Sequence, residues 1–561
     1  MKLKRYRSKR KYDPILPGPR EWPVVQLSRN RKEFLKEVAE EAYGRIKNNT
    51  RTKTALIEEL ETTLYKEKAR IRQNPWKVDP DDEHQFWGKV KNELLEISQQ
   101  KAKDEEKANK ILYDIIERYA DEIAGNFNTS HYRFARGIAT FGFNRLLNAA
   151  RVKKLGGFWS NELTMNDKIQ INGEAEKLRT LAKKGTVVIV PTHSSNLDSI
   201  LIGWVIYTLG LPPVIYGAGL NLFNISIISY FMNSLGAYKV DRRKRNLIYL
   251  ETLKSYSALA LKKGCQSLFF PGGTRSRDGR VEKELKLGLL GTAIEAQRSN
   301  YEEFGENAEK IFIVPASLNY HFVLEAPSLI RQYLEKQGQE RYYVENDEFS
   351  SSYKIITFLF KFFTKGSDIS VSIGEPMDIL GNKVDDDGRS FDTTGREIHP
   401  KDYFTFQDKI TVNKQREAEY TRMLSKKIVE QYSKIARVFS SHLIAFTAFE
   451  MIRKRNKKLD LFALLRLPEE DLVITFSEFR TVCQRIKNKI EERISEGRMS
   501  QAEHMNDKID NIIEHGLLNL GMYHSKRPLI KTKEGDITTM DMNLLYFYRN
   551  RLDGYGLEKH I

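Results

Sequence analysis

The chain has 561 residues, of which 40% are hydrophobic and 30% are charged. This composition excludes a disordered protein, and the length predicts two or three domains rather than one core. A net charge of +17, from 92 basic against 75 acidic residues, indicates anionic partners such as lipid headgroups, nucleic acid or phosphorylated substrates. The two cysteines, Cys265 and Cys483, are far apart, which excludes a disulfide framework and a cysteine metal cluster and points to a reducing compartment.

Residues 1–127 are predicted to form a basic tail and a helical N-terminal domain. The first eleven residues are strongly basic, and no apolar segment follows them, so we expect a solvated tail rather than a secretory signal. From residue 31 onwards apolar side chains recur at helical spacing, and residues 82–124 are typical of one long helix. This part carries no reactive motif, which favours a helical appendage.

Residues 128–380 alternate between short apolar runs and helical segments. The runs that are typical of buried strands are 187–190, 213–216, 267–270, 311–314 and 369–373. Such alternation predicts an α/β fold with a mixed, largely parallel sheet flanked by helices, and with all-helical extensions at both ends of the chain. Functional sites in sheets of this kind lie at the carboxyl ends of the strands.

Residues 381–402 are turn-rich and contain the run Asp385, Asp386, Asp387 and Gly388. They are therefore interpreted as a linker or an exposed loop. Helical periodicity returns afterwards, so residues 403–561 are predicted to form a helical C-terminal region, in which Ser500 and Glu503 form a capping box.

An uncharged segment covers residues 199–238. A helix that spans a bilayer needs about 20 continuous apolar residues, and this segment is interrupted at Gly210, Pro212 and Pro213. We therefore predict a monotopic protein whose surface dips into one leaflet. Residues 131–150 form an amphipathic segment with arginines at one end, which suits either core packing or a membrane surface.

His193 and Asp198 follow the apolar run 187–190. Ser195 and Asp198 form a capping-box pattern, so Asp198 should lie in the first turn of a helix and His193 in the loop before it. A carboxylate on one imidazole nitrogen would fix the tautomer and leave the other nitrogen as a general base. On these residues alone, His193 could also be a loop histidine bonded to backbone, and Asp198 an acid favoured by the helix dipole.

Two basic turns follow further along the chain. The first contains Arg242 and Arg245, and the second runs from Phe270 to Arg280, with Lys286 shortly after it. Glycines between basic residues, directly after a strand, suit an anionic group that backbone N–H groups and arginines can bind. An exposed basic turn is the alternative, and the pattern is not a P-loop.

In order along the chain, the segments 193–198, 236–242, 270–276 and 313–315 resemble the four sequence blocks of the glycerolipid acyltransferases. Residues 210–222 and Tyr548 to Leu552 resemble most the bacterial membrane-bound glycerol-3-phosphate acyltransferases. The likeness is strong over residues 182–327 and weaker over the C-terminal part.

The resemblance implies transfer of a fatty acyl group from a thioester of acyl carrier protein or coenzyme A to glycerol 3-phosphate, the first step of phospholipid synthesis. It implies a membrane lipid surface at the cytoplasmic face, no metal or other cofactor, and no nucleic acid. His193 would be the base and Asp198 its support, and Pro315 would shape the acyl pocket. The residues that would bind the acceptor are Arg242, Arg245, Gly273, Thr274, Arg275, Ser276 and Lys286.

Two positions depart from the family pattern. Gly272 stands where the family has a glutamate, and we expect Gly272→Glu to be tolerated or mildly harmful. The second block, with Asp241, Arg242 and Arg245, is closer to lysophosphatidate acyltransferases. These departures leave open a lysophospholipid acceptor and, from another class, a catalytically decayed basic protein that binds membranes or nucleic acid.

Overall fold

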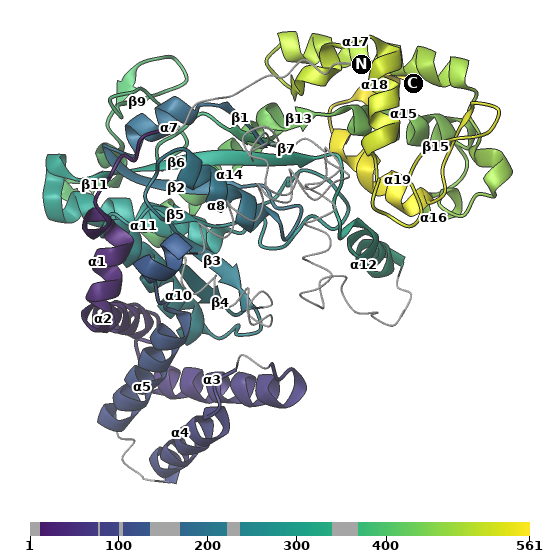
Figure 1. The fold of residues 1–561 in the computed structure, drawn as a ribbon. Coiled ribbons are helices and arrows are strands. Elements are labelled where there is room, and N and C mark those ends of the chain that lie inside the picture. Colours follow the sequence, from purple (N-terminus) through teal and green to yellow (C-terminus); the bar gives the residue numbers. More distant parts are fainter. Residues whose placement is uncertain (1–11, 77–78, 100–104, 135–168, 221–235, 339–368) are drawn as a thin grey trace.

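A seven-stranded sheet lies at the centre of the chain (Figure 1). The computed structural model describes residues 12–76, 79–99, 105–134, 169–220, 236–338 and 369–561. The sheet order is β1-β7-β6-β2-β5-β3-β4, with the strands β1 (Ile169–Gly173), β2 (Gly185–Pro191), β3 (Ile215–Gly219), β4 (Ala237–Val240), β5 (Ser267–Leu268), β6 (Lys310–Tyr320) and β7 (Ile369–Ile373). Only β6 and β7 pair antiparallel among these neighbours, so the mixed, largely parallel sheet is confirmed.

β2 is apolar throughout because both of its faces are covered. Val187 and Ile189 belong to one core and Val188 and Val190 to another, as expected for a strand whose side chains alternate between two packed faces. The helices that accompany the sheet are α7 (Ala175–Leu181), α8 (Asp198–Thr208), α10 (Leu247–Lys262), α11 (Leu287–Phe304) and α12 (Ala326–Gly338).

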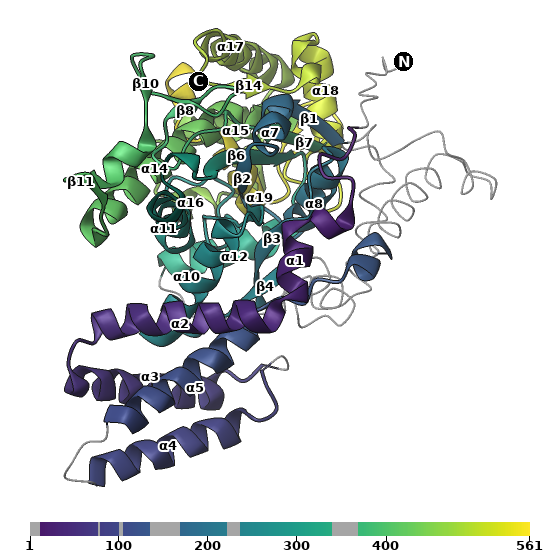
Figure 2. The same cartoon turned by 90° about the vertical axis from the view of Figure 1, so that its left-hand side faces the viewer.

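The N-terminal helices pack on α10 and on the β3–β4 side of the sheet, as Figure 2 shows for α2. They are α1 (Pro23–Arg29), α2 (Arg31–Asn49), α3 (Lys53–Gln73), α4 (Glu83–Gln99) and α5 (Glu105–Ile123). Their core continues into Tyr238, Ile248 and Tyr249 of the α/β part. The single helix expected over residues 82–124 is instead the pair α4 and α5, which contact each other and so bury apolar stripes that one extended helix would expose.

The C-terminal helices gather on the opposite side of Figure 1 and share a core with β1, β2, β6 and β7. They are α15 (Ser440–Arg455), α16 (Leu461–Leu464), α17 (Phe476–Ser495), α18 (Ile509–Asn519) and α19 (Met542–Arg549). The preceding helix α14 (Lys414–Ile435) instead packs against α11 and β6. α15 is the central one, because every residue from Ser440 to Ile452 is buried. The predicted cap at Ser500 is wrong: Ser500 belongs to β14 (Ser500–Gln501), which pairs with β13 (Arg437–Val438), and that pairing uses its backbone.

Residues 381–402 contain more regular structure than the expected linker or exposed loop. Three short strands, β8 (Lys383–Val384), β9 (Ser390–Phe391) and β10 (Glu397–Ile398), form a small antiparallel sheet. The aspartates that suggested a loop make its turns: Asp385 Oδ1 accepts the N–H groups of Asp387 and Arg389, a pattern typical of aspartate in tight turns.

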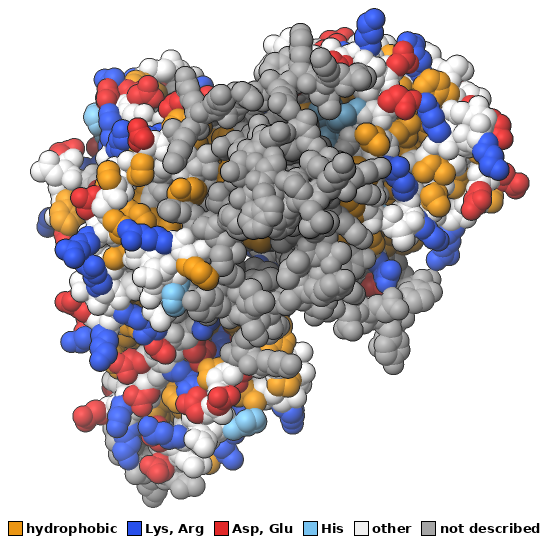
Figure 3. Space-filling view, in the orientation of Figure 1, with side chains coloured by type: hydrophobic (Ala, Val, Ile, Leu, Met, Phe, Trp, Pro, Cys, Tyr) orange, Lys and Arg blue, Asp and Glu red, His pale blue; other side chains and the backbone are white. Residues whose placement is uncertain are grey.

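Basic and acidic side chains are interspersed over the described surface in Figure 3, so the positive charge is spread over this face. Within the described residues, no helix combines the length and the apolar character that crossing a bilayer requires. Three segments on which sequence expectations were placed lie outside the described residues: 1–11, 135–150 and 221–235.

Candidate active site

His193 and Asp198 meet in the loop between β2 and α8. Asp198 is the first residue of α8 and is fully buried, and its Oδ2 lies 2.9 Å from His193 Nδ1. The same oxygen accepts the backbone N–H groups of Ser194 (2.6 Å) and Ser195 (2.9 Å), while Oδ1 accepts the hydroxyl of Tyr320. An ionised carboxylate only accepts hydrogen bonds, so Nδ1 carries the ring proton and Nε2 keeps its lone pair.

The capping box expected at Ser195 is only half present. The Asp198 side chain accepts the Ser195 N–H, but the Ser195 hydroxyl donates to Glu325 (2.9 Å) and accepts the N–H of Leu197 (3.2 Å). α8 therefore begins at Asp198 itself. The reason is the buried Glu325 carboxylate, which needs donors and takes the hydroxyl that a capping box would use.

The site lies at the edge of the sheet where parallel strands end. His193 follows β2, Arg242 follows β4, and the glycine-rich turn follows β5. The His193 ring stacks on Phe270, with ring centroids 4.1 Å apart, and its side chain is 13% exposed. The imidazole is thus held on one side by an aromatic ring and remains accessible to a substrate.

Glu282 supplies a buried carboxylate beside the glycine that departs from the family pattern. Its Oε1 accepts the backbone N–H of His193 at 2.6 Å, and its Oε2 is buried without a hydrogen-bond partner among the described residues. A Cβ on Gly272 would lie 3.0 Å from Glu282 Cγ. Burial raises the pKa of Glu282 to about 7, opposed by the His193 N–H. A carboxyl group therefore reaches the space next to position 272 from elsewhere in the chain.

Glu325 fastens Arg275 to the loop that carries His193. Glu325 is fully buried and accepts the Asn196 N–H (2.8 Å), the Ser195 hydroxyl and the Arg275 guanidinium (3.2 Å). Burial raises the pKa of Glu325, and the charge of Arg275 opposes this rise. The Glu325 carboxylate thus couples the position of Arg275 to that of the His193 loop.

The basic turn after β4 is held by the N-terminal helices. Arg243 binds Asp79 and stacks on Trp76, with 4.1 Å from its guanidinium carbon to the ring centroid. Lys244 is buried and paired with Glu122, and the Asn246 amide donates to Glu67 (3.0 Å). The helical appendage therefore fixes the shape of the turn from which Arg242 projects.

Arg242 differs from Arg243 and Lys244, which follow it, because no described carboxylate pairs with it. Its side chain is exposed, yet the surrounding protein and then the positive charge of Arg275 lower its pKa. Arginine stays protonated even so. Two guanidinium groups close enough to repel each other, one of them without a carboxylate partner, suit a dianionic ligand.

The other predicted binding residues have more varied surroundings. Gly273 has a φ of 77°, which favours glycine, and its N–H donates to the Phe270 carbonyl. Lys286 and Thr274 have exposed side chains, as does Arg245. The Ser276 hydroxyl donates to the Arg280 carbonyl (2.7 Å) and its N–H to the His193 carbonyl (2.8 Å). Pro315 lies within β6, paired with Val190 in β2.

Arg551, from the short 3₁₀-helix Asn550–Leu552, reaches the same loop from the C-terminal region. It is buried and donates to the Ser194 hydroxyl at 2.5 Å. Burial lowers the pKa of Arg551, opposed by the charges of Glu282 and Asp198. This arginine therefore balances two carboxylates around the His193 loop.

Four residues of the site were not predicted from the sequence: Tyr320, Glu282, Glu325 and Arg551. Arg551 had a signal, because it lies in the stretch from Tyr548 to Leu552 that resembles the family. The others had none, since an isolated tyrosine or glutamate has no local pattern. In the described part of the chain, the set of metal-ligating side chains that converge does not include His193.

Comparison with known proteins places this geometry in a family context. Residues 172–319 match the model of the Acyltransferase family. The match runs from the end of β1 into β6 and includes His193, Asp198 and both basic turns. The resemblance to glycerolipid acyltransferases expected from the sequence is confirmed.

Similar curated proteins carry the name glycerol-3-phosphate acyltransferase. Those of Histophilus somni, Pseudoalteromonas atlantica and Aeromonas hydrophila are 29%, 27% and 33% identical over 245, 233 and 209 residues. The aligned regions cover 43%, 41% and 37% of this chain but 26%, 25% and 22% of those proteins, so the chain matches about a quarter of their length.

One solved structure is also similar, the 1-acyl-sn-glycerophosphate acyltransferase of Thermotoga maritima. Its alignment has 15% sequence identity and covers 66% of this chain and 93% of that one. The TM-score is 0.24, too low to support an argument about the arrangement of the whole chain.

Proposed function

We propose that the protein is a glycerol-3-phosphate acyltransferase that uses a thioester of acyl carrier protein or coenzyme A as donor. The observation that carries the proposal is the His193 imidazole, whose Nδ1 is held by Asp198 while Nε2 keeps its lone pair. This base lies in a domain that matches the Acyltransferase family, beside two arginines suited to a phosphate.

In the proposed reaction, Nε2 of His193 removes the proton from a glycerol hydroxyl as its oxygen attacks the thioester carbonyl. A carbon–oxygen bond forms, and the tetrahedral intermediate then collapses with loss of the carbon–sulfur bond. The thiolate takes the proton from the imidazolium and leaves as a thiol. Asp198 stabilises the imidazolium between these steps, because a negative charge beside Nδ1 favours the protonated ring.

We assign the acceptor phosphate to Arg242 and Arg275, with Arg245, Lys286, Thr274, Ser276 and the N–H groups near Gly273 around it. Charge-assisted bonds from arginine to phosphate are stronger than neutral ones. Pro315 is assigned to the wall of the acyl pocket. A lysophospholipid is the second candidate acceptor, favoured by the spacing of Asp241, Arg242 and Arg245 in the second block.

We place the enzyme on the cytoplasmic face of the membrane as a monotopic protein. α8 begins directly at the site and has no charged residue after Asp198; Ile200 is 38% exposed and Gly203 is also exposed. An exposed, uncharged helix surface next to the base suits an acyl chain that arrives from a lipid leaflet.

Purified protein in lipid or detergent, given radiolabelled glycerol 3-phosphate and each donor in turn, tests the proposal. The expected product is lysophosphatidate, formed with at least one of the two donors. Labelled lysophosphatidate as acceptor is the second arm, and faster turnover there would favour the second candidate. No product from either acceptor with either donor would contradict the proposal.

Arg242→Ala is expected to raise KM for glycerol 3-phosphate about 10- to 100-fold with little change in KM for the acyl donor. A hydrogen bond to a charged group contributes about 1.5–3 kcal/mol, and Arg242 has no described carboxylate partner whose loss would disturb the fold. Steady-state kinetics with each substrate varied measures this. Arg396→Ala is the matched control, since the Arg396 side chain is exposed and lies far from the site residues in the sequence. Equal rises in both KM values of Arg242→Ala would contradict a phosphate role.

Gly272→Glu is expected to lower kcat/KM about 10- to 100-fold, in contrast to the mild effect expected from the sequence. The Cβ of the new side chain would lie 3.0 Å from Glu282 Cγ. Its carboxylate would be a second one in the same buried space. Adding Glu282→Gly should recover about tenfold, because one carboxylate then remains.

Gly288→Glu is the matched control for that exchange, because a Cβ on Gly288 meets no atom within 4 Å. It should retain the activity of the unaltered protein. A double variant no more active than Gly272→Glu alone would show that Glu282 does not replace the missing carboxylate.

A further inference from the structure

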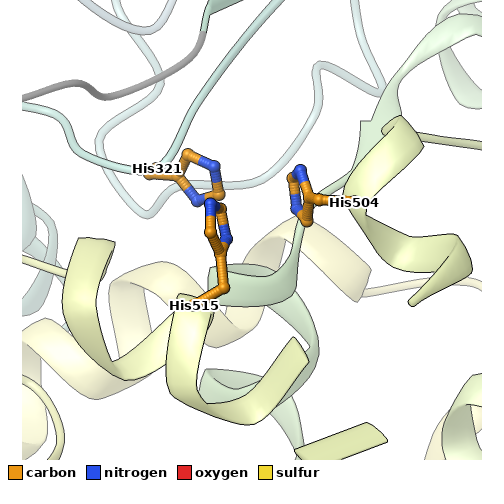
Figure 4. Close-up of side chains that lie close together, drawn as sticks. All are labelled: His321, His504 and His515. Carbon is orange, nitrogen blue, oxygen red and sulfur yellow. The ribbon is translucent and has the colours of Figure 1, made fainter. Parts of the chain in front are cut away.

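Three histidines converge away from the His193 site, between the end of β6 and the C-terminal helices (Figure 4). His321 follows β6, His504 lies in the 3₁₀-helix Glu503–Asn506, and His515 lies in α18. One ring nitrogen from each lies within 4.8 Å of the others. Segments far apart in sequence thus bring three potential ligands to one point.

The start of α15 holds the second ring nitrogen of each histidine. His321 Nδ1 lies 3.0 Å from the Ser441 hydroxyl, and His515 Nδ1 lies 2.8 Å from the Ser440 hydroxyl. The Ser440 backbone N–H donates to His504 Nε2 at 3.0 Å. The two serine hydroxyls can accept the ring N–H of His321 and His515, as the outer contacts of metal-bound imidazoles do.

The cluster contains a buried nitrogen without a hydrogen-bond partner in the described part of the chain. His321 is fully buried, and its Nε2 has no hydrogen-bond partner among the described residues; a buried polar atom of this kind calls for a ligand.

We propose that His321, His504 and His515 bind a divalent transition-metal ion of the zinc type. Imidazole ligands suit zinc, cobalt, nickel and copper, whereas magnesium and calcium prefer oxygen. A tetrahedral site with metal–nitrogen bonds of about 2.0–2.1 Å needs nitrogens about 3.3 Å apart, so the rings must close in slightly. His504 Nε2 accepts the Ser440 N–H, so ligation through His504 Nδ1 requires the tautomer with the proton on Nε2 and gives up this hydrogen bond.

His442 lies beside this cluster but is excluded from the ligand set. Its Nδ1 accepts the Phe439 N–H at 3.2 Å, and its Nε2 donates to the Tyr320 carbonyl at 3.2 Å. Both of its nitrogens are therefore used. This difference provides a buried control histidine a few residues from the proposed site.

The proposed ion would link the C-terminal helices to β6, the strand whose Tyr320 binds Asp198. His321 follows Tyr320, whose hydroxyl bonds Asp198, and precedes Glu325, which holds Arg275. α15 and α18 belong to the C-terminal region. The role is therefore structural, and it does not depend on the proposed acyl transfer.

The full chain, produced without a histidine tag and purified without chelator, tests the site. We expect about one equivalent of zinc by elemental analysis and, after exchange into Co²⁺, the visible absorption bands of tetrahedral cobalt. At a zinc concentration about 100 times Kd, the Tm should be about 3–5 °C higher than that of the metal-free protein. The cobalt spectrum requires no variant.

His515→Gln and His504→Gln should lose the bound metal and the Tm response, while His442→Gln and the exposed His399→Gln should keep both. A metal content at background in the unaltered protein, with no cobalt spectrum and no Tm shift, would overturn the site. Equal metal loss in His399→Gln and His515→Gln would show an adventitious ion only.

Discussion

His193→Ala is expected to lower kcat about 10²–10⁴-fold, the range typical of a lost general base. The structure sharpens the expectation, because Nδ1 is committed to Asp198 and only Nε2 can take a proton. Of the two glutamates that contact the loop, Glu282 accepts the His193 N–H with Oε1 while its Oε2 is buried, and Glu325 is paired with Arg275. Neither is placed to replace the base.

The measurement is kcat with saturating glycerol 3-phosphate and acyl donor, after circular dichroism and Tm have shown that the variant is folded. His84→Ala, at an exposed histidine in α4, is the matched control and should keep full activity. A folded His193→Ala protein with near-normal kcat would refute the proposed mechanism.

Asp198→Asn is expected to lower kcat about 10²–10³-fold and to leave KM for glycerol 3-phosphate nearly unchanged. In the Ser-His-Asp triad the matching change costs about 10⁴-fold because it forces the wrong tautomer. Here Oδ2 accepts the His193 ring N–H and the N–H groups of Ser194 and Ser195. The amide oxygen should keep this place, so the tautomer survives and only the charge that stabilises the imidazolium is lost.

Asp198→Ala separates charge from geometry. It removes the acceptor for both backbone N–H groups, so the loop loses its support, and the loss should exceed that of Asp198→Asn and be accompanied by a lower Tm. Buried donors left unsatisfied cost about 1–3 kcal/mol each. Equal losses of kcat in the two variants would contradict the view that the tautomer survives in Asp198→Asn.

Local sequence patterns predicted the strand and the helix on either side of the loop that contains His193 and Asp198. The apolar run 187–190 is within β2, Asp198 is in the first turn of α8, and the strands of the α/β part form the expected mixed sheet. These predictions succeed because strand burial and helix starts depend on neighbouring residues, whose spacing the sequence contains. The ends of parallel strands then bring His193, Arg242 and Arg275 to one edge, as the general rule for such sheets requires.

The side chains that surround His193 and Asp198 could not be predicted from local patterns, because the tertiary structure brings them together. Glu282, Glu325 and Arg551 come from separate parts of the chain, and each is buried only because other elements pack around it. A carboxylate or an arginine in a sequence is by default a solvated side chain, so no local spacing marks these three. The same holds for Lys244, which the N-terminal helices bury against Glu122.

The sequence by itself determined the α/β architecture, the placement of His193 and Asp198 across a strand-to-helix loop, and the two basic turns. Tertiary structure decided which charges are paired, and so left Arg242 without a described carboxylate while pairing Arg243 and Lys244. It also decided that the Glu282 side chain lies beside Gly272, and that His321, His504 and His515 meet. The physical reason is that hydrogen-bond geometry and backbone propensity act between near neighbours, whereas burial and charge pairing depend on contacts between residues hundreds of positions apart.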